Sequence, residues 1–238
     1  MSNLSIANPK AALYEQFAGV AKSLGNPQRL EIIEHLAQAP RSVEALAAKL
    51  SLPVANVSQH LQAMRRAGLL STRRDGKFVI YHLSGDSVLA AFAAIRAVAE
   101  QQSAEVERVV RGWFDARDDA EPVSHEELSA RMEADLVTVI DVRPADEFAL
   151  GHLPGAINLP LQELVEDLRQ DLEGHLGRLG ARLGGQLGAG REIVAYCRGP
   201  WCVLSFEAVA MLRQHGLQAR RLKDGLPEWR AAGYAVET

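Results

Sequence analysis

Apolar residues in the first half of the chain recur every three or four positions, which is the spacing of amphipathic helices. Four such stretches predict helices over residues 13–24, about 27–37, 43–50 and 54–67. The pattern breaks at residues 25–27, where Pro27 suits the first turn of the next helix. Gly68 follows the fourth stretch, a position where glycine commonly ends a helix. The pattern therefore predicts a small, mainly helical unit.

The fourth predicted helix carries a polar face opposite its apolar one. Val57, Leu61 and Met64 form the apolar face, and residues 51–53 form a turn that joins this helix to the third. Two helices joined by a short turn, the second polar on its outer face, are typical of a helix-turn-helix. The outward positions hold Asn56, Ser58, Gln59, Gln62, Arg65 and Arg66.

A basic hairpin is predicted directly after this helix. Residues 69–72 and 78–83 have the character of strands, and the Asp75-Gly76 pair between them favours a tight turn. Between Ser58 and Phe78 the chain carries five Lys or Arg residues and one acid. The charged tip, Arg73 to Lys77, would serve as a wing against DNA phosphates. The alternative is a solvated hairpin on a small helical domain.

An alanine-rich stretch from Asp86 to about Arg117 predicts one long helix with apolar residues over much of its surface. Such a helix is buried either against a second copy of the chain or in the core of a single one, and we favour the dimer. A polar segment ended by Pro122 follows. We expect it to link a first domain over residues 1–118 to a second over 123–238.

Strands and helices alternate in the second half. Residues 136–141, 193–196 and 219–222 read as strands, and helices are expected from Ser124, a capping-box residue, and over 203–215. This alternation predicts a mostly parallel sheet covered on both faces. Residues 161–190 keep a leucine at every third or fourth position, but six glycines between residues 174 and 188 interrupt the pattern. We expect a helix to about Glu173, then a mobile or partly helical insertion.

The most informative stretch is the end of the strand at residues 193–196. Cys197 follows it, and a helix begins near Val203. A sharp strand-to-helix turn collects backbone N–H groups around one point and binds anions, so the pKa of Cys197 is expected to fall. Arg198 adds positive charge nearby. Cys202 either resolves an oxidised Cys197 into a disulfide or packs under the loop. The plain alternative is a buried structural cysteine.

Composition narrows the setting of this chemistry. The two cysteines stand five positions apart, which fits a reduced, cytoplasmic protein better than a secreted disulfide framework. Neither a membrane-spanning run nor a signal peptide is expected. Residues 1–118 hold 14 basic and 11 acidic residues (+3), and residues 119–238 hold 12 and 19 (−7), which sums to −4. The first half therefore suits a polyanionic partner.

Three blocks of the second half resemble the rhodanese family of sulfurtransferases, which carry sulfur as a cysteine persulfide. They are residues 141–160, beginning Asp-Val-Arg-Pro, residues 196–202 and residues 223–229. The resemblance implies Cys197 as the nucleophile. Asp141 and Arg143 would pair to support the strand end, although a plain surface ion pair is equally compatible. The six-residue span from Cys197 to Cys202 resembles sulfurtransferases. Phosphatase or arsenate chemistry, with a loop one residue longer, is the weaker alternative. The predicted anion or persulfide loop comprises Arg198, Gly199, Pro200, Trp201, Cys202 and Val203.

Residues 12–100 resemble ArsR-type winged-helix repressors, chiefly in residues 55–61, 67–70 and 73–77. The resemblance implies a homodimer that leaves DNA when a ligand binds. Many members carry a cysteine pair where this chain has Ser42 and Glu44, and others carry histidine on the dimer helix, where this chain has none. No metal site and no cofactor are therefore expected. The predicted base readers are Asn56, Ser58, Gln59 and His60, and the predicted phosphate contacts are Arg65, Arg73, Arg74 and Lys77.

Together these patterns predict a multidomain protein: a mainly-α winged helix-turn-helix followed by an α/β rhodanese-like domain with a central parallel sheet. Its expected partners are double-stranded operator DNA and a sulfane-sulfur donor such as thiosulfate, polysulfide or persulfide. The favoured function is a DNA-binding repressor that senses or transfers reactive sulfur through Cys197. The main alternative is a sulfurtransferase enzyme tethered to DNA or regulating its own gene. A metal- or arsenic-responsive repressor is disfavoured.

Overall fold

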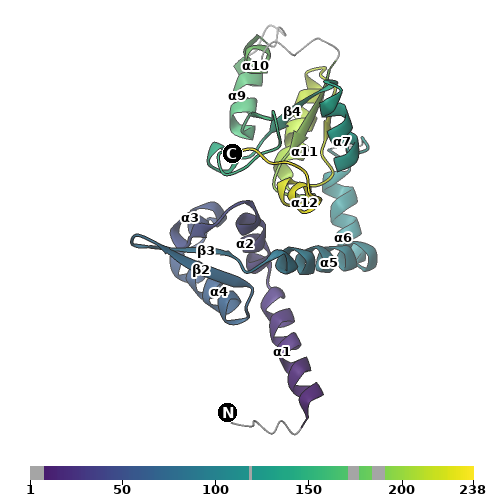
Figure 1. Cartoon of the computed structure of the whole chain (residues 1–238). Coiled ribbons are helices and arrows are strands. Elements are labelled where there is room, and N and C mark those ends of the chain that lie inside the picture. Colours follow the sequence, from purple (N-terminus) through teal and green to yellow (C-terminus); the bar gives the residue numbers. More distant parts are fainter. Residues whose placement is uncertain (1–7, 118–119, 171–176, 184–190) are drawn as a thin grey trace. The chain divides into compact units, whose positions relative to one another are not determined.

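The computed structural model describes residues 8–117, 120–170, 177–183 and 191–238 (Figure 1). The chain divides into two compact units, residues 1–99 and residues 100–238. Residues 100–117 thus pack with the C-terminal unit, although the sequence places them before the linker. In the parts of the chain described here, no helix is long and apolar enough to cross a membrane.

The N-terminal unit is a helical core with a projecting hairpin (Figure 1). A three-stranded antiparallel sheet in the order β1-β3-β2 flanks the helices. Ile32, Ile33, Leu46, Leu61 and Met64 are fully buried at its centre. The elements are α1 (Pro9–Leu24), α2 (Pro27–Gln38), β1 (Arg41–Ser42), α3 (Val43–Leu50), α4 (Val54–Arg66), β2 (Leu70–Asp75), β3 (Phe78–Leu83) and α5 (Asp86–Gln102). The four predicted helices and the hairpin are therefore present.

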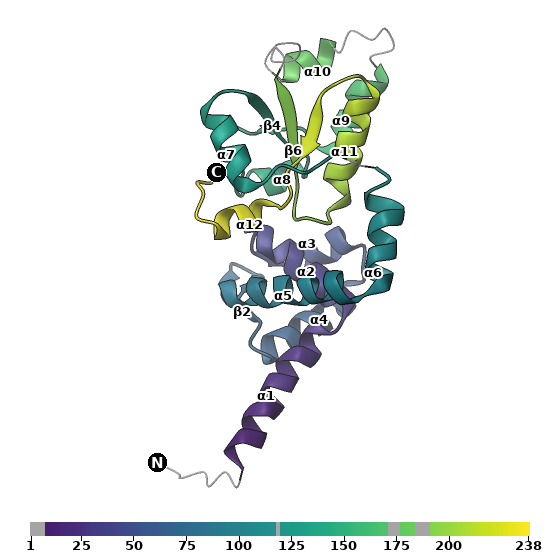
Figure 2. The same ribbon diagram turned by 90° about the vertical axis from the view of Figure 1, so that its right-hand side faces the viewer.

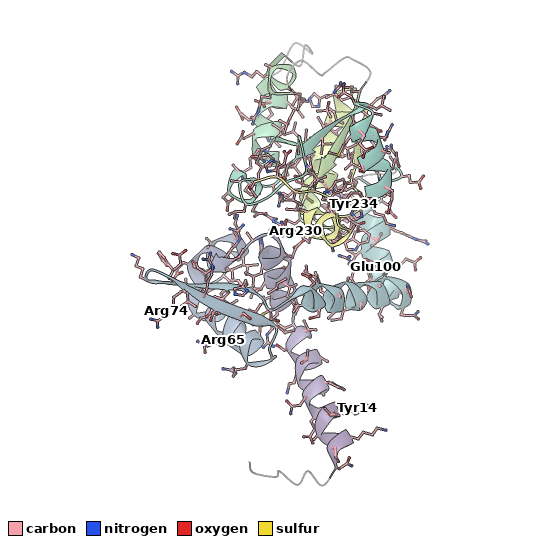
Figure 3. The ribbon with its side chains drawn as sticks, viewed as in Figure 1. Tyr14, Arg65, Arg74, Glu100, Arg230 and Tyr234 are labelled. Carbon is pink, nitrogen blue, oxygen red and sulfur yellow. The ribbon has the colours of Figure 1, made fainter. Side chains whose placement is uncertain are left out.

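Helices α1 and α5 leave apolar side chains uncovered within one chain. On α1, Leu13 is 56% exposed and Phe17 61%, and on α5 Val98 is 62% exposed. Tyr14 also points outward from α1 (Figure 3). Only the C-terminal end of α1, at Ser23 and Leu24, is buried. The predicted apolar face of the first helix is therefore present, but the chain's own core does not cover it.

The prediction of one long helix from Asp86 to about Arg117 is wrong in one respect, because the helix breaks at Ser103. Helix α5 ends at Gln102, and the Ser103 hydroxyl accepts a hydrogen bond from the Val106 amide to cap α6 (Ala104–Val109). A π-helical turn, η1 (Val110–Phe114), continues α6. Serine competes for backbone N–H groups and so favours a helix start over a helix interior.

The C-terminal unit is a four-stranded parallel sheet with helices on both faces (Figure 2). The strand order is β5-β4-β6-β7, so β4 and β6 are central. The strands are β4 (Val137–Asp141), β5 (Ile157–Asn158), β6 (Glu192–Tyr196) and β7 (Ala219–Arg221). The helices are α7 (His125–Glu133), α8 (Ala145–Phe148), α9 (Leu161–Gln170), α10 (Gly177–Arg182), α11 (Val203–Gln214) and α12 (Leu226–Ala231).

Alternating strand residues serve two separate cores. Ile140, Ile193 and Ala195 face the cluster that contains α9, α10 and α11. Val139 and Val194 face the cluster that contains α7 and α12. A sheet buried on both faces explains why its strands read as nearly continuous apolar runs. Part of the predicted insertion is helical, namely α10, whereas the expected helix end at Glu173 lies outside the described residues.

Candidate functional site

Cys197 lies directly after the central strand β6, on the sharp turn that leads into α11. Its side chain is 1% exposed. The sulfur lies 3.3 Å from the Ser205 hydroxyl, 3.4 Å from the Cys202 carbonyl oxygen and 3.9 Å from the Gly199 carbonyl oxygen. Ser205 in turn donates to the Cys202 carbonyl at 3.2 Å. The loop therefore encloses the sulfur with oxygen atoms that accept a thiol proton.

This enclosure reverses the expected acidity of the cysteine. Burial raises the pKa of the Cys197 thiol well above its ordinary value, and the neighbouring Cys202 side chain raises it further. Hydrogen bonds from Ser205 act in the opposite direction and are weaker. The predicted fall in the Cys197 pKa is therefore wrong for this conformation, because burial outweighs the strand-to-helix turn. In this conformation the loop favours the protonated thiol over the thiolate.

Arg198 does not supply its charge to the sulfur. Its guanidinium donates two hydrogen bonds to the Glu147 carboxylate, at 2.8 and 2.9 Å, and Glu147 is fully buried. Paired guanidinium–carboxylate bonds fix orientation as well as charge. The expectation that Arg198 adds positive charge near Cys197 is therefore corrected: its charge is neutralised, and it ties the loop to α8.

Asp141 and Arg143 form the expected pair, and it is a buried one. Both side chains have no exposed surface, and Arg143 donates to Asp141 and to the Gly151 carbonyl at 2.7 Å. Asp141 is the register partner of Tyr196, the residue before Cys197. The pair therefore fixes the strand end beside the cysteine loop, and the alternative of a plain surface ion pair is wrong.

The remaining loop residues connect Cys197 to its surroundings. Trp201 is half-buried and contacts Phe114 of η1, with ring centroids 4.9 Å apart. Cys202 precedes the first residue of α11, Val203, and is 7% exposed. Both cysteines are free thiols. The second thiol is thus close enough to influence the first, yet no bond joins them.

Helix α4 and the hairpin present the predicted DNA-contacting residues on the N-terminal unit. Asn56, Gln59 and Arg65 are exposed, as are Arg73, Arg74 and Lys77 of the hairpin. Figure 3 shows Arg65 and Arg74 projecting from α4 and β2. Gly76 adopts a left-handed backbone with φ of 58°, which the tight turn requires. These six side chains are exposed to solvent.

Two predicted base readers are less exposed. Ser58 is half-buried, and its hydroxyl accepts a hydrogen bond from Gln62 at 3.3 Å. His60 is also half-buried, and its Nδ1 lies 3.4 Å from the Arg29 guanidinium of α2. Burial and the Arg29 charge lower the pKa of His60, which favours the neutral ring. A neutral ring whose Nδ1 accepts from Arg29 keeps Nε2–H as its donor.

Comparison with known proteins places both domains of the chain in described families. A family model for a helix-turn-helix domain matches residues 24–73, and a model for a rhodanese-like domain matches residues 124–232. The HTH-type transcriptional regulator Rv0324 of Mycobacterium tuberculosis is 39% identical over 228 residues, which cover 96% of this chain and 93% of that protein. The chain belongs to the HTH-type transcriptional regulators.

Solved structures resemble the two parts of the regulator separately. The homodimeric winged helix-turn-helix DNA-binding domain of Mb0332 from Mycobacterium bovis, described as a possible ArsR-family regulator, is 37% identical. It covers 44% of the regulator and 95% of that chain, with a TM-score of 0.39. A rhodanese-related protein from Thermoplasma volcanium is 24% identical, and the match covers 50% of the regulator and 98% of that chain, with a TM-score of 0.37.

The predicted fold class is confirmed for the regulator. Its N-terminal part is a mainly-α winged helix-turn-helix, and its C-terminal part is an α/β rhodanese-like domain with a central parallel sheet. Sequence reasoning missed two residues of the cysteine site, Glu147 and Ser205. Glu147 stands six positions after Asp141 in the first rhodanese-like block, which was a usable signal. Ser205 lies within an ordinary helical pattern and gave none.

Proposed function

We propose that this regulator represses transcription as a homodimer and that sulfane sulfur on Cys197 changes its affinity for operator DNA. One observation carries the proposal: the chain joins a helix-turn-helix to a rhodanese-like domain whose only cysteines stand on one strand-to-helix loop. Because the first half contains no cysteine, a sulfur signal at a thiol has to enter through Cys197 or Cys202. The sensor function then requires communication along the chain.

The DNA-binding half uses α4 and the wing. Asn56, Ser58, Gln59 and His60 read base edges, while Arg65, Arg73, Arg74 and Lys77 contact phosphates. Two copies read a near-palindromic duplex. Their interface is the uncovered apolar surface of α1 and α5, where Phe17 and Val98 are more than half exposed. The Mycobacterium bovis domain, which is 37% identical to this part of the chain, is described as homodimeric.

The sulfur step begins when Cys197 loses its proton to solvent. The thiolate attacks the outer sulfur of thiosulfate, the S–S bond of the donor breaks, and sulfite leaves with the bonding electron pair. The product is a persulfide on Cys197. A polysulfide donates in the same way and leaves one sulfur shorter. Because the enclosed thiol has a raised pKa, the reaction requires the loop to open and admit water and donor.

Cys202 offers two outcomes for this persulfide. Its thiolate can attack the inner sulfur, form a Cys197–Cys202 disulfide and expel hydrosulfide, provided that the loop adopts the narrow disulfide geometry. Otherwise Cys202 only packs at the start of α11. We favour the packing role, because the loop is short and the Arg198–Glu147 pair fixes one end of it.

Mass spectrometry of the intact protein tests the sulfur step. After incubation with thiosulfate or polysulfide, we expect the mass of one sulfur atom on Cys197, removable by reductant and absent from Cys197→Ser. Label on Cys202 alone would contradict the assignment. The competing function, a DNA-tethered sulfurtransferase, is separated by thiosulfate:cyanide turnover. Sustained turnover that operator DNA leaves unchanged would favour the enzyme, whereas a single loading event per chain favours the sensor.

A further inference from the structure

Four aromatic rings join the cysteine loop to the helical segment that precedes the sheet. We call Trp113, Phe114, Trp201 and Phe206 the aromatic clamp. The Phe114 ring lies between two partners, with centroids 4.9 Å from Trp201 and 4.8 Å from Phe206. Trp113 lies 6.4 Å from Phe206. All four residues belong to the C-terminal unit. The π-helical turn η1 thus packs directly on the loop and on the first turn of α11.

Further contacts hold the clamp at both ends. The Trp201 indole N–H donates to the Glu100 carboxylate at 2.5 Å, and Glu100 lies in the last turn of α5. The Arg117 guanidinium lies 4.0 Å from the Trp113 ring centroid, and that of Arg221 lies 4.1 Å from Phe206. Cations over aromatic faces stabilise such packing. One loop residue, Trp201, is therefore bound to two points of the segment that continues from the helix-turn-helix unit.

Sulfur loading has to disturb this arrangement. A persulfide places a second sulfur about 2 Å beyond the first. Around the Cys197 sulfur, the Ser205 hydroxyl and the Cys202 carbonyl already stand at 3.3 and 3.4 Å, and the side chain is 1% exposed. Close-packed interiors do not absorb an extra atom without displacement. Arg198 is fixed by Glu147 at one end of the loop, so the displacement falls on the half that carries Trp201.

We propose that the aromatic clamp is the coupling device of the regulator: sulfur loading of Cys197 moves Trp201 away from Phe114 and Glu100. This movement frees the end of α5, the helix that continues into the helix-turn-helix unit. The inference rests on the proposed sulfur-sensing function and names its mechanism. A tenfold change in operator affinity corresponds to 1.4 kcal/mol, a coupling that the loss of one aromatic contact and one hydrogen bond can supply.

Removing the Phe114 ring tests the clamp in the full-length protein. Phe114→Leu keeps a large apolar side chain but loses the ring contacts. Phe148→Leu is the matched control, because Phe148 stacks on His152 in the same unit, outside the clamp. The DNA probe is a duplex selected from random sequence by the reduced protein. Its affinity is measured by fluorescence anisotropy for reduced and polysulfide-treated protein, with complete loading verified by mass.

The ratio of the two affinities decides the outcome. For the wild type and Phe148→Leu, we expect the affinities of reduced and loaded protein to differ at least tenfold. For fully loaded Phe114→Leu, we expect the two affinities to differ by no more than about twofold. Trp201→Phe keeps a ring against Phe114 but loses the hydrogen bond to Glu100, so it should give an intermediate ratio. This variant also tests the clamp if Phe114→Leu does not fold. A wild-type ratio retained in both variants overturns the clamp alone. A wild-type ratio of one overturns sulfur sensing itself, and the clamp with it.

Discussion

Adding one methyl group at Gly225 should displace the cysteine loop. Gly225 belongs to the third rhodanese-like block, and it precedes the first residue of α12. A Cβ built there lies 2.5 Å from the Gly199 backbone nitrogen and still closer to the Arg198 carbonyl group. Ordinary contact begins near 3.4 Å. Since the obstructing atoms are backbone, Gly225→Ala forces a loop shift of about 1 Å.

The size of the effect follows from this overlap. Overpacking of a well-packed site costs about 1–3 kcal/mol, and the backbone of Gly225 itself needs no left-handed conformation. The matched control is Gly177→Ala, because Gly177 begins α10 in the same unit and a Cβ there meets no atom within 4 Å. We expect the control to stay within about 0.5 kcal/mol of wild type.

Urea unfolding followed by tryptophan fluorescence isolates the relevant unit, because Trp113, Trp201 and Trp229 all lie in residues 100–238. Alkylation of Cys197 by iodoacetamide provides a second readout, since a displaced loop uncovers the sulfur. We expect Gly225→Ala to be less stable and faster to alkylate than Gly177→Ala. Equal stability and equal alkylation rates in the two variants would refute the close packing of α12 against the loop.

Three further outcomes are expected. Asp141→Asn removes the partner of the buried Arg143 charge and should lower the free energy of unfolding by about 3–5 kcal/mol, measured with the same fluorescence signal. A double replacement, Arg73→Ala with Arg74→Ala, should weaken binding to all duplexes. It should also make the slope of log binding constant against log salt concentration shallower by about 2 units, and an unchanged slope would remove the wing from the interface. Because its pKa is lowered in the fold, His60 resists a proton that the unfolded chain accepts. Far-UV circular dichroism should therefore show stability falling as pH drops through about 6.5, an effect absent from His60→Gln.

The sequence was sufficient for the longer helices and strands and for their order, but it did not predict the short elements β1, α8, β5 and α12. Helical periodicity marked α1 to α4, the Asp75-Gly76 pair marked the hairpin turn, and apolar runs marked the sheet. These features depend on the spacing of residues close together in the sequence, so a single sequence is enough to predict them. The break at Ser103 was missed because alanine-rich residues on both sides continue a helical pattern, and one capping side chain decides where the helix ends.

The charges and pKa values of the cysteine site depend on contacts between residues far apart in the sequence, which the spacing of residue types does not predict. The turn after β6 is where it was expected, yet the pKa of Cys197 moves in the opposite direction, because burial of the sulfur penalises the thiolate and the neighbouring Cys202 adds to this effect. Arg198 was assigned to the anion, but a buried carboxylate 51 positions earlier in the chain takes its guanidinium. The Asp141–Arg143 pair was recoverable, since its members are two positions apart at a strand end.

The central claim is that sulfur at Cys197 changes operator binding. The direct measurement is the affinity of the intact protein for its selected duplex, in the reduced form and after persulfidation, at one fixed salt concentration. Cys197→Ser is treated identically. We predict that the affinity of the wild type changes at least tenfold and that the affinity of Cys197→Ser does not change. Equal affinities for reduced and fully persulfidated wild type would contradict the account and favour the tethered sulfurtransferase.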